Sequence, residues 1–214
     1  MMSRRSASLS IAAVTLLPAL PLRAQAQIST ALAINRAARL RALSQRSAKL
    51  YTQTMLDVMP QNARDAMTAA QRLIQISLDD LSRAALTGAL ANQYTTVGQN
   101  AASFTSLLSA VPHKDQLTRI NTSADRLLAE ADKLTGMLEA SAKQGSAKLI
   151  NTSGRQRMLS QRLAKNYFLT AAGIETPTSR LQLTDDRNEF KANLDTLGAA
   201  PISTTAIRNE LQLV

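Results

Sequence analysis

Apolar residues recur every three or four positions over long stretches of the chain, which is the spacing of one face of an α-helix. The alternation of apolar and polar residues that is typical of strands does not recur. Proline and glycine fall near the ends of the periodic stretches, as at Pro60, Pro112, Pro177, Gly145 and Gly173. We predict helices over residues 28–58, 61–88, 91–109, 114–144, 146–172 and 179–197, and a last one from about Ile202 to Val214.

The intervals between these predicted helices are short, so neighbouring helices are expected to run antiparallel. Aromatic residues make up only 3% of the chain, and cysteine is absent. Thin interfaces of small residues and the absence of disulfides both suit long packed helices. The sequence therefore predicts an all-α protein, an antiparallel helical bundle of the four-helix type.

The first 26 residues have the features of a secretory signal. Arg4 and Arg5 precede an apolar stretch from Ile11 to Leu20, and Ala24 and Ala26 frame a small-x-small cleavage site. The apolar stretch is shorter than the roughly 20 residues that a bilayer span needs. We therefore expect a protein exported to the periplasm that begins near Gln27, by the general secretion or the twin-arginine route. The alternative is a membrane tether formed by an uncleaved signal.

One segment occurs twice in the chain. Residues 34–51 read INRAARLRALSQRSAKLY, and residues 150–167 read INTSGRQRMLSQRLAKNY. The two segments are 116 residues apart and identical at 11 of 18 positions, with no gap. We refer to them as the first and second signature segments. The spacing predicts a first helical unit over residues 27–145 and a second, incomplete unit over residues 146–214. Either the second unit is shortened or the sequence lacks its natural C-terminus.

Positive charge is concentrated in these two segments. Without residues 1–26 the chain carries 22 basic and 15 acidic residues, an excess of seven. The signature segments contribute nine basic residues and no acid, so the rest of the chain is nearly neutral. The basic residues are Arg36, Arg39, Arg41, Arg46 and Lys49 in the first segment, and Arg155, Arg157, Arg162 and Lys165 in the second.

At 100° per residue, one narrow stripe of each signature segment combines small residues with an arginine and a glutamine. In the first segment the stripe contains Ile34, Ala37, Ala38, Arg41, Gln45 and Ala48. In the second it contains Ile150, Ser153, Gly154, Arg157, Gln161 and Ala164. Small residues allow another helix to approach closely, so we expect Arg41 and Arg157 to lie in a seam between helices.

A guanidinium in such a seam needs a negative partner, because a buried unpaired charge is costly. The signature segments contain no carboxylate, so we expect Arg41 and Arg157 to lack a partner and to attract an anion. Other polar residues fall on a different face, where we expect arginines that are solvated or paired with acids of neighbouring helices. These residues are Asn35, Arg39 and Arg46, with Asn151, Arg155 and Arg162 as their counterparts. Leu43 and Leu50 point to the core side.

The run INTSGRQRMLSQRLAK resembles the signature helix of the PilJ-like sensor domain. That domain occurs at the N-terminus of type IV pilus chemotaxis transducers and in nitrate/nitrite sensor kinases. In those kinases the corresponding helix pairs with its symmetry mate, and a glycine and an arginine of each helix hold a nitrate at the dimer axis. The resemblance implies that Gly154 and Arg157 have these roles. In the first segment it implies Arg41, with Ala38 in place of the glycine.

Two arrangements remain open: Arg41 and Arg157 meet within one chain as a pseudo-dimer, or each signature helix meets its own copy in a homodimer. The ligand-binding candidates are Arg41, Arg157, Gly154, Ala38, Gln45 and Gln161. A single planar oxyanion between two guanidiniums would relieve their repulsion and accept hydrogen bonds from both. Nitrate and nitrite are the first candidates.

We expect no enzyme, cofactor or metal site, because the only histidine, His113, has no cysteine or second histidine near it. The pairs Asp79-Asp80 and Asp185-Asp186 are interpreted as solvated helix faces. Nucleic-acid binding does not fit an exported protein without aromatic residues among its basic ones. Two functions remain: an exported sensory protein for a small oxyanion that signals through a membrane receptor or sensor kinase, and a structural helical adaptor that docks on a receptor bundle.

Overall fold

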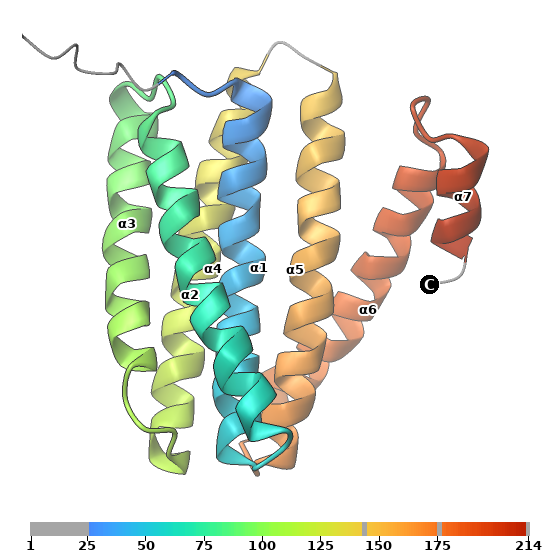
Figure 1. Ribbon diagram of the computed structural model, residues 1–214. Coiled ribbons are helices and arrows are strands. Elements are labelled where there is room, and N and C mark those ends of the chain that lie inside the picture. Colours follow the sequence, from blue (N-terminus) through green and yellow to red (C-terminus); the bar gives the residue numbers. More distant parts are fainter. Residues whose placement is uncertain (1–25, 143–144, 175–176, 213–214) are drawn as a thin grey trace, which may run out of the picture.

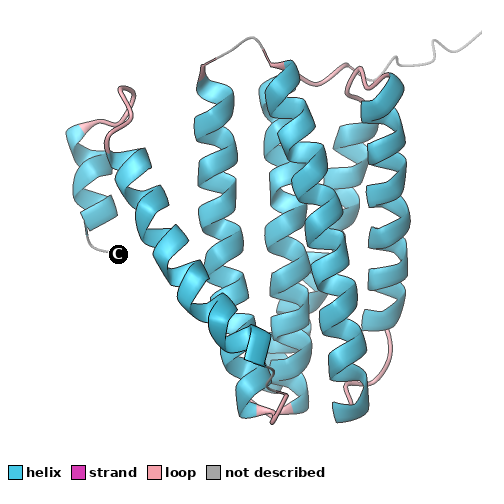
Figure 2. Cartoon of the chain, turned by 180° about the vertical axis from the view of Figure 1, so that it is seen from behind, coloured by secondary structure: helices cyan, strands magenta, loops and turns pink. Residues whose placement is uncertain are grey.

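The computed structural model describes residues 26–142, 145–174 and 177–212, so residues 1–25 of the predicted signal lie outside it. Every element in the described residues is helical and none is a strand (Figure 2). The α-helices are α1 (Thr30–Met55), α2 (Pro60–Ser82), α3 (Gly88–Leu108), α4 (Leu117–Ser141), α5 (Ser146–Ala171), α6 (Pro177–Gly198) and α7 (Thr205–Gln212). A short 3-10 helix, Lys114–Gln116, precedes α4. The predicted all-α bundle is confirmed.

The helix ends follow from local sequence. Ser29 caps α1, because its side chain accepts a hydrogen bond of 3.2 Å from the backbone nitrogen of Leu32. Pro60 opens α2, where its missing N–H costs nothing. The predicted end of α2 at residue 88 is wrong. Gly88 has a φ of +53° and begins α3, since glycine can take the left-handed turn out of the preceding loop.

Helix α1 is the central helix of the bundle, and α2, α4 and α5 all pack on it (Figure 1). Successive helices alternate in direction, which makes α1 and α5 parallel. The core is aliphatic, with Tyr51 and Phe104 buried among leucines and alanines. Each fully buried leucine or phenylalanine side chain contributes about 1.5–3 kcal/mol, so α1 is held mainly by this apolar burial.

Helices α5, α6 and α7 form one edge of the molecule. Helix α6 packs on α5 near the start of α6 and then leans away from the bundle (Figures 1 and 2). The widening gap contains an apolar cavity of about 230 Å³ that residues of α5, α6 and α7 line. Within the described part of the chain, no helix is both long and apolar enough to cross a bilayer.

The position of each signature segment decides how far its stripe is buried. Each segment lies within one continuous helix, the first in α1 and the second in α5. All six stripe residues of α1 are buried. On α5, however, Ser153 and Arg157 are exposed, because α5 is an edge helix and α6 diverges from it. The division into units at residue 145 and the tandem repeat of a whole domain stay predictions.

Candidate functional site

The signature helices α1 and α5 pack against each other within the chain, and Gly154 marks a point of very close approach. A Cβ atom built on Gly154 would lie 2.6 Å from the Cβ of Ala38 and 3.0 Å from Nη2 of Arg41. Ordinary carbon contacts are about 3.5–4.0 Å. Glycine at position 154 therefore allows the two backbones to come this near, and it places Arg41 against α5.

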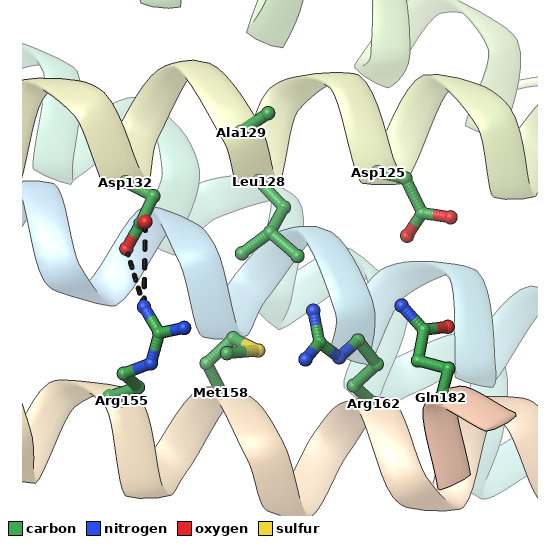
Figure 3. Close-up of a pocket in the computed structure, with 8 residues that line it drawn as sticks. All are labelled: Asp125, Leu128, Ala129, Asp132, Arg155, Met158, Arg162 and Gln182. Atoms are coloured by element: carbon green, nitrogen blue, oxygen red, sulfur yellow. Dashed lines mark hydrogen bonds and ion pairs between the residues drawn. The ribbon is translucent and has the colours of Figure 1, made fainter. Parts of the chain in front are cut away.

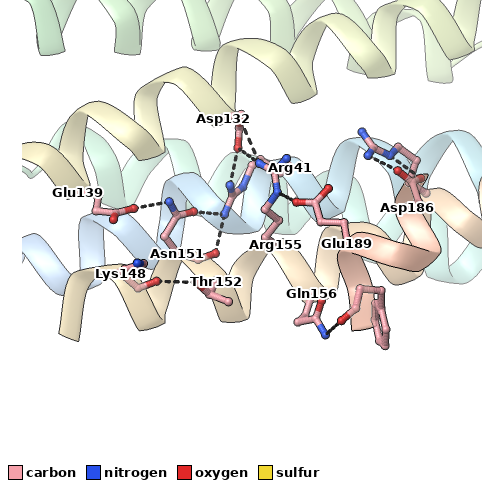
Figure 4. A network of polar contacts seen from close by, with 12 residues as sticks. Arg41, Asp132, Glu139, Lys148, Asn151, Thr152, Arg155, Gln156, Asp186 and Glu189 are labelled. Atoms are coloured by element: carbon pink, nitrogen blue, oxygen red, sulfur yellow. Dashed lines mark hydrogen bonds and ion pairs between the residues drawn. The ribbon is translucent and has the colours of Figure 1, made fainter. Parts of the chain in front are cut away.

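Arg41 is completely buried, and both of its terminal nitrogens have partners, whereas its Nε has none among the described residues. Its Nη1 donates to Oδ1 of Asp132 on α4 at 2.5 Å, and its Nη2 donates to Asn151, at 2.8 Å to Oδ1 and 3.1 Å to the carbonyl oxygen (Figure 4). The expectation that Arg41 lacks a carboxylate partner was wrong, because α4 supplies one. Burial lowers the pKa of Arg41, and the Asp132 carboxylate opposes this effect.

Asp132 belongs to a wider polar network between α4, α5 and α6 (Figure 4). It also pairs with Arg155 at 3.3 Å, and Arg155 in turn pairs with Glu189 of α6. Asn151 donates to Glu139, which fixes the amide that receives Arg41. The charge of Arg41 is thus balanced by the protein itself, so an anion is not required at this guanidinium.

Arg157 differs from its counterpart although it makes the reciprocal contact. Its Nη2 donates to Oδ1 of Asn35 at 2.9 Å, just as Arg41 donates to Asn151. The prediction that both asparagines lie on a face away from these arginines is wrong, because each asparagine contacts the arginine of the other helix. No acid pairs with Arg157 in the described residues, and its other N–H groups have no acceptor there. Although Arg157 is exposed as a whole residue, partial burial of its guanidinium lowers its pKa.

The remaining predicted residues do not converge on one point. Gln45 is buried and turned toward α4, where its Nε2 donates to the carbonyl oxygen of Ala124 at 3.3 Å. Gln161 accepts a hydrogen bond of 3.1 Å from Nζ of Lys49. The structure brings together Ala38, Gly154 and Arg41. Gln161 lies apart from them, beside Lys49 of α1.

Two cavities border Arg157. The first has a volume of about 470 Å³, and we call it the seam cavity. Arg157 is the only charged residue in its lining, and its other polar lining residues are Asn35, Ser146 and Ser153. The second, of about 220 Å³, lies between α1, α2 and α5, and we call it the arginine cavity. It is lined by Arg39, Arg46 and Arg157, together with Ser160, Gln161 and Leu73.

A third cavity, of about 300 Å³, lies between α4, α5 and α6 and is electrically balanced. Figure 3 shows Arg155 and Arg162 of α5 facing Asp132 and Asp125 of α4. Arg162 also forms a two-pronged ion pair with Asp186 of α6. Its cations already have acidic partners, so this cavity has little need of an anion.

The aspartate pairs correct a third expectation, that both residues of each pair are solvated. Asp79 and Asp185 are exposed, but Asp80 and Asp186 are buried and carry ion pairs. Asp80 pairs with Arg36, at 2.5 Å, and with Arg83, while Asp186 pairs with Arg162. Adjacent helical residues diverge, as expected, so one residue of each pair points inward.

Arg39 and Arg46 are not among the predicted ligand residues, because arginines on the outer face are expected to be solvated or paired with acids. Arg155 and Arg162 are indeed paired with acids of α6. Arg39 and Arg46 have no such partner in the described residues. Their unpaired state becomes visible only when α2 is compared with α6, because α6 supplies acids to Arg155 and Arg162 and α2 supplies none to Arg39 and Arg46. That comparison requires the fold.

The α5–α7 edge of the molecule is the part that matches a known protein family. A family model, the type IV pili methyl-accepting chemotaxis transducer N-terminal domain, covers the last turn of α4 and the helices α5, α6 and α7. Residues 138–212 are a PilJ match. The PilJ resemblance of the second signature segment is thereby confirmed. The first signature segment lies outside the matched residues, and no curated protein or solved structure matches the chain.

The PilJ family is a sensor type and a non-catalytic one, which suggests a sensory or signalling role for the matched residues. Within the PilJ match lie Gly154, which sets the approach of α5 to α1, and Arg157. The match also includes Arg155 and Arg162, whose acidic partners Glu189 and Asp186 fall in the same segment.

Proposed function

We propose that this protein is an exported sensory protein that binds a small oxyanion, with nitrate and nitrite as the first candidates, at Arg157 in the seam cavity. The observation that carries the proposal is the state of Arg157. It is the only cation in the lining of that cavity, its single hydrogen bond goes to a neutral amide, and no acid accompanies it. A monoanion would balance this charge.

Neutral side chains around Arg157 suit a planar oxyanion. Asn35 and Ser153 line the same cavity and can donate hydrogen bonds from an amide and a hydroxyl group. Arginine provides a planar fork of donors that matches the oxygens of such an ion. Because Asn35 belongs to α1 and Arg157 to α5, a ligand bonded to both would link the two signature helices.

In this proposal the buried residues of the predicted site act as supports. Arg41, held by Asp132, is a fixed positive charge behind the seam, and Ala38 and Gly154 set how closely α5 approaches. A ligand that ties α5 to α1 would restrain the α5–α7 edge. A membrane receptor or sensor kinase in contact with that edge would then receive the signal.

Titration calorimetry with nitrate and nitrite at fixed ionic strength tests the proposal. We expect saturable binding to the wild type and loss of binding in Arg157→Ala. At 100 times the dissociation constant, ligand should add about 2.7 kcal/mol to the free energy of unfolding. The ligand-free Arg157→Ala protein should be as stable as the wild type, because no ion pair is lost.

The matched control is Arg126→Ala, since Arg126 is an exposed arginine of α4 outside the lining of both cavities. It should bind like the wild type. Arg162→Ala is not a suitable control, because it would leave the buried carboxylate of Asp186 without its ion-pair partner. Identical flat traces for wild type and Arg157→Ala with both ions would contradict the proposal.

A structural adaptor is the second candidate, and the α5–α7 edge favours it. Large apolar side chains are exposed there: Tyr167 and Leu181 are each 68% accessible, as is Ile202. A partner helix could cover these side chains. If no oxyanion binds, and the cationic seam and this edge instead contact a receptor bundle, the adaptor function replaces the sensory one.

A further inference from the structure

The arginine cavity concentrates positive charge that the protein does not neutralise. Arg39 and Arg46 enter it from α1 and Arg157 enters it from α5, and its lining contains no acid. None of the three arginines forms an ion pair with any described residue. Leu73 of α2 and Ala42 and Leu43 of α1 form the apolar part of its wall.

The second signature helix has the acidic partners that the arginines of the first signature helix lack. Arg39 and Arg46 recur 116 residues later as Arg155 and Arg162, which pair with Glu189 and Asp186 of α6. Helix α2 follows α1 as α6 follows α5, and a Leu-Asp-x-Leu run at residues 78–81 recurs at 194–197 in the same register.

In that register, the positions of Asp186 and Glu189 correspond to Ala70 and Leu73 of α2. Ala70 is buried, and Leu73 lines the arginine cavity. The first copy has therefore kept both arginines while carrying apolar residues at the places of both acids.

Unbalanced guanidiniums repel one another, and in a half-buried cavity water screens them only partly. Burial lowers the pKa of Arg39, and the charges of Arg36 and Arg157 lower it further, while the more distant Asp80 carboxylate, which forms no ion pair with Arg39, opposes them in part. Burial lowers the pKa of Lys49, and the charge of Arg46 lowers it further. Lys49 donates a hydrogen bond to Gln161 in the cavity wall. An anion in the cavity would remove this repulsion.

We propose that the arginine cavity binds a small dianion: sulfate, hydrogen phosphate or a short dicarboxylate. Three arginines without an acid match two negative charges better than one, whereas the seam cavity has a single cation. Guanidinium forks from two helices would hold the oxygens, and Leu73, Ala42 and Leu43 would contact the remainder of the ligand. This site goes beyond the proposed nitrate site, with which it shares Arg157.

The sharpest test introduces an acid into α2 at the position where α6 has Glu189. Leu73→Glu places a carboxylate beside Arg39 and Arg46, where it should take the place of the ligand. By calorimetry at fixed ionic strength, with sulfate, phosphate and succinate as separate titrants and chloride as the monoanion control, the wild type should bind at least one dianion. Leu73→Glu should bind it at least about tenfold more weakly.

Ile76→Glu is the matched control, because Ile76 is an exposed residue of the same helix outside the cavity lining. It should bind the dianion like the wild type. Arg46→Gln is the second variant, and it serves if Leu73→Glu does not fold. It should weaken dianion binding by at least about tenfold as well, and circular dichroism will show that it is folded.

The titrants also identify the source of the ligand. Binding of sulfate or phosphate indicates an inorganic oxyanion, and binding of succinate alone indicates a dicarboxylate; either result supports the proposal if Leu73→Glu and Arg46→Gln lose it. No dianion binding to the wild type, or equal binding to Arg46→Gln, would overturn it. Nitrate is titrated separately: Arg46→Gln should retain nitrate binding, so failure at the seam cavity is distinguishable from failure here.

Discussion

Replacing Asp132 with alanine is expected to lower the free energy of unfolding by about 3 kcal/mol. Arg41 is fully buried, and among the described residues Asp132 is its only carboxylate partner. Without it, a guanidinium stays in the core with only the hydrogen bonds to Asn151. The loss lies at the lower end of the range for broken buried pairs, because the Asp132 side chain is 42% accessible. Urea unfolding followed by circular dichroism measures it.

Two variants test whether the stranded charge is the cause. Asp65→Ala removes an exposed acid of α2 and should change stability by less than about 0.5 kcal/mol. Arg41→Met combined with Asp132→Ala removes the charge together with its partner and should recover most of the lost stability. If the double variant is as unstable as Asp132→Ala alone, the ion pair does not explain the effect.

Gly154→Ala is expected to destabilise the protein by about 1–2 kcal/mol, although alanine is the better helix former. The new Cβ would lie 2.6 Å from the Cβ of Ala38, so α1 and α5 must separate. Overpacking of this kind costs about 1–3 kcal/mol, and the gain in helix propensity returns at most about 1 kcal/mol. The same urea titration measures the net change.

Gly136→Ala on α4 is the control, because nothing lies within 4 Å of a Cβ at that position. It should stabilise the protein by up to about 1 kcal/mol. Combining Ala38→Gly with Gly154→Ala removes the Cβ of residue 38, which the new Cβ at position 154 would otherwise contact. The double variant should therefore relieve the clash. Equal stabilisation by Gly154→Ala and Gly136→Ala would show that the helices are not in close contact there.

Much of the fold could be predicted from the sequence, because periodicity, proline and glycine are local signals. They predicted the existence and order of all the helices, and the small-residue stripes predicted that the signature segments would face another helix. The end of α2 was missed, since Gly88 could serve equally as a helix end or as the turn before α3.

The polar partners could not be predicted, because they depend on which helices become neighbours. Asp132 is 91 residues from Arg41 in the chain, and nothing in the signature segment points to it. Likewise, the difference between Arg46 and Arg162 lies in α2 and α6, where Ala70 and Asp186 hold corresponding positions. Only the arrangement of α1, α2, α5 and α6 shows that one arginine is neutralised and the other is not.

Because α1 and α5 pack on each other within one chain, their contact should not depend on protein concentration. Where a seam forms between two separate molecules, its population depends on protein concentration and vanishes below the dissociation constant of the dimer. Here both helices belong to one polypeptide, so the seam closes as an intramolecular event at a high effective concentration. Ligand affinity and unfolding midpoint should therefore be the same at nanomolar and micromolar protein. A cell could keep such a protein at very low copy number without losing the contact between α1 and α5.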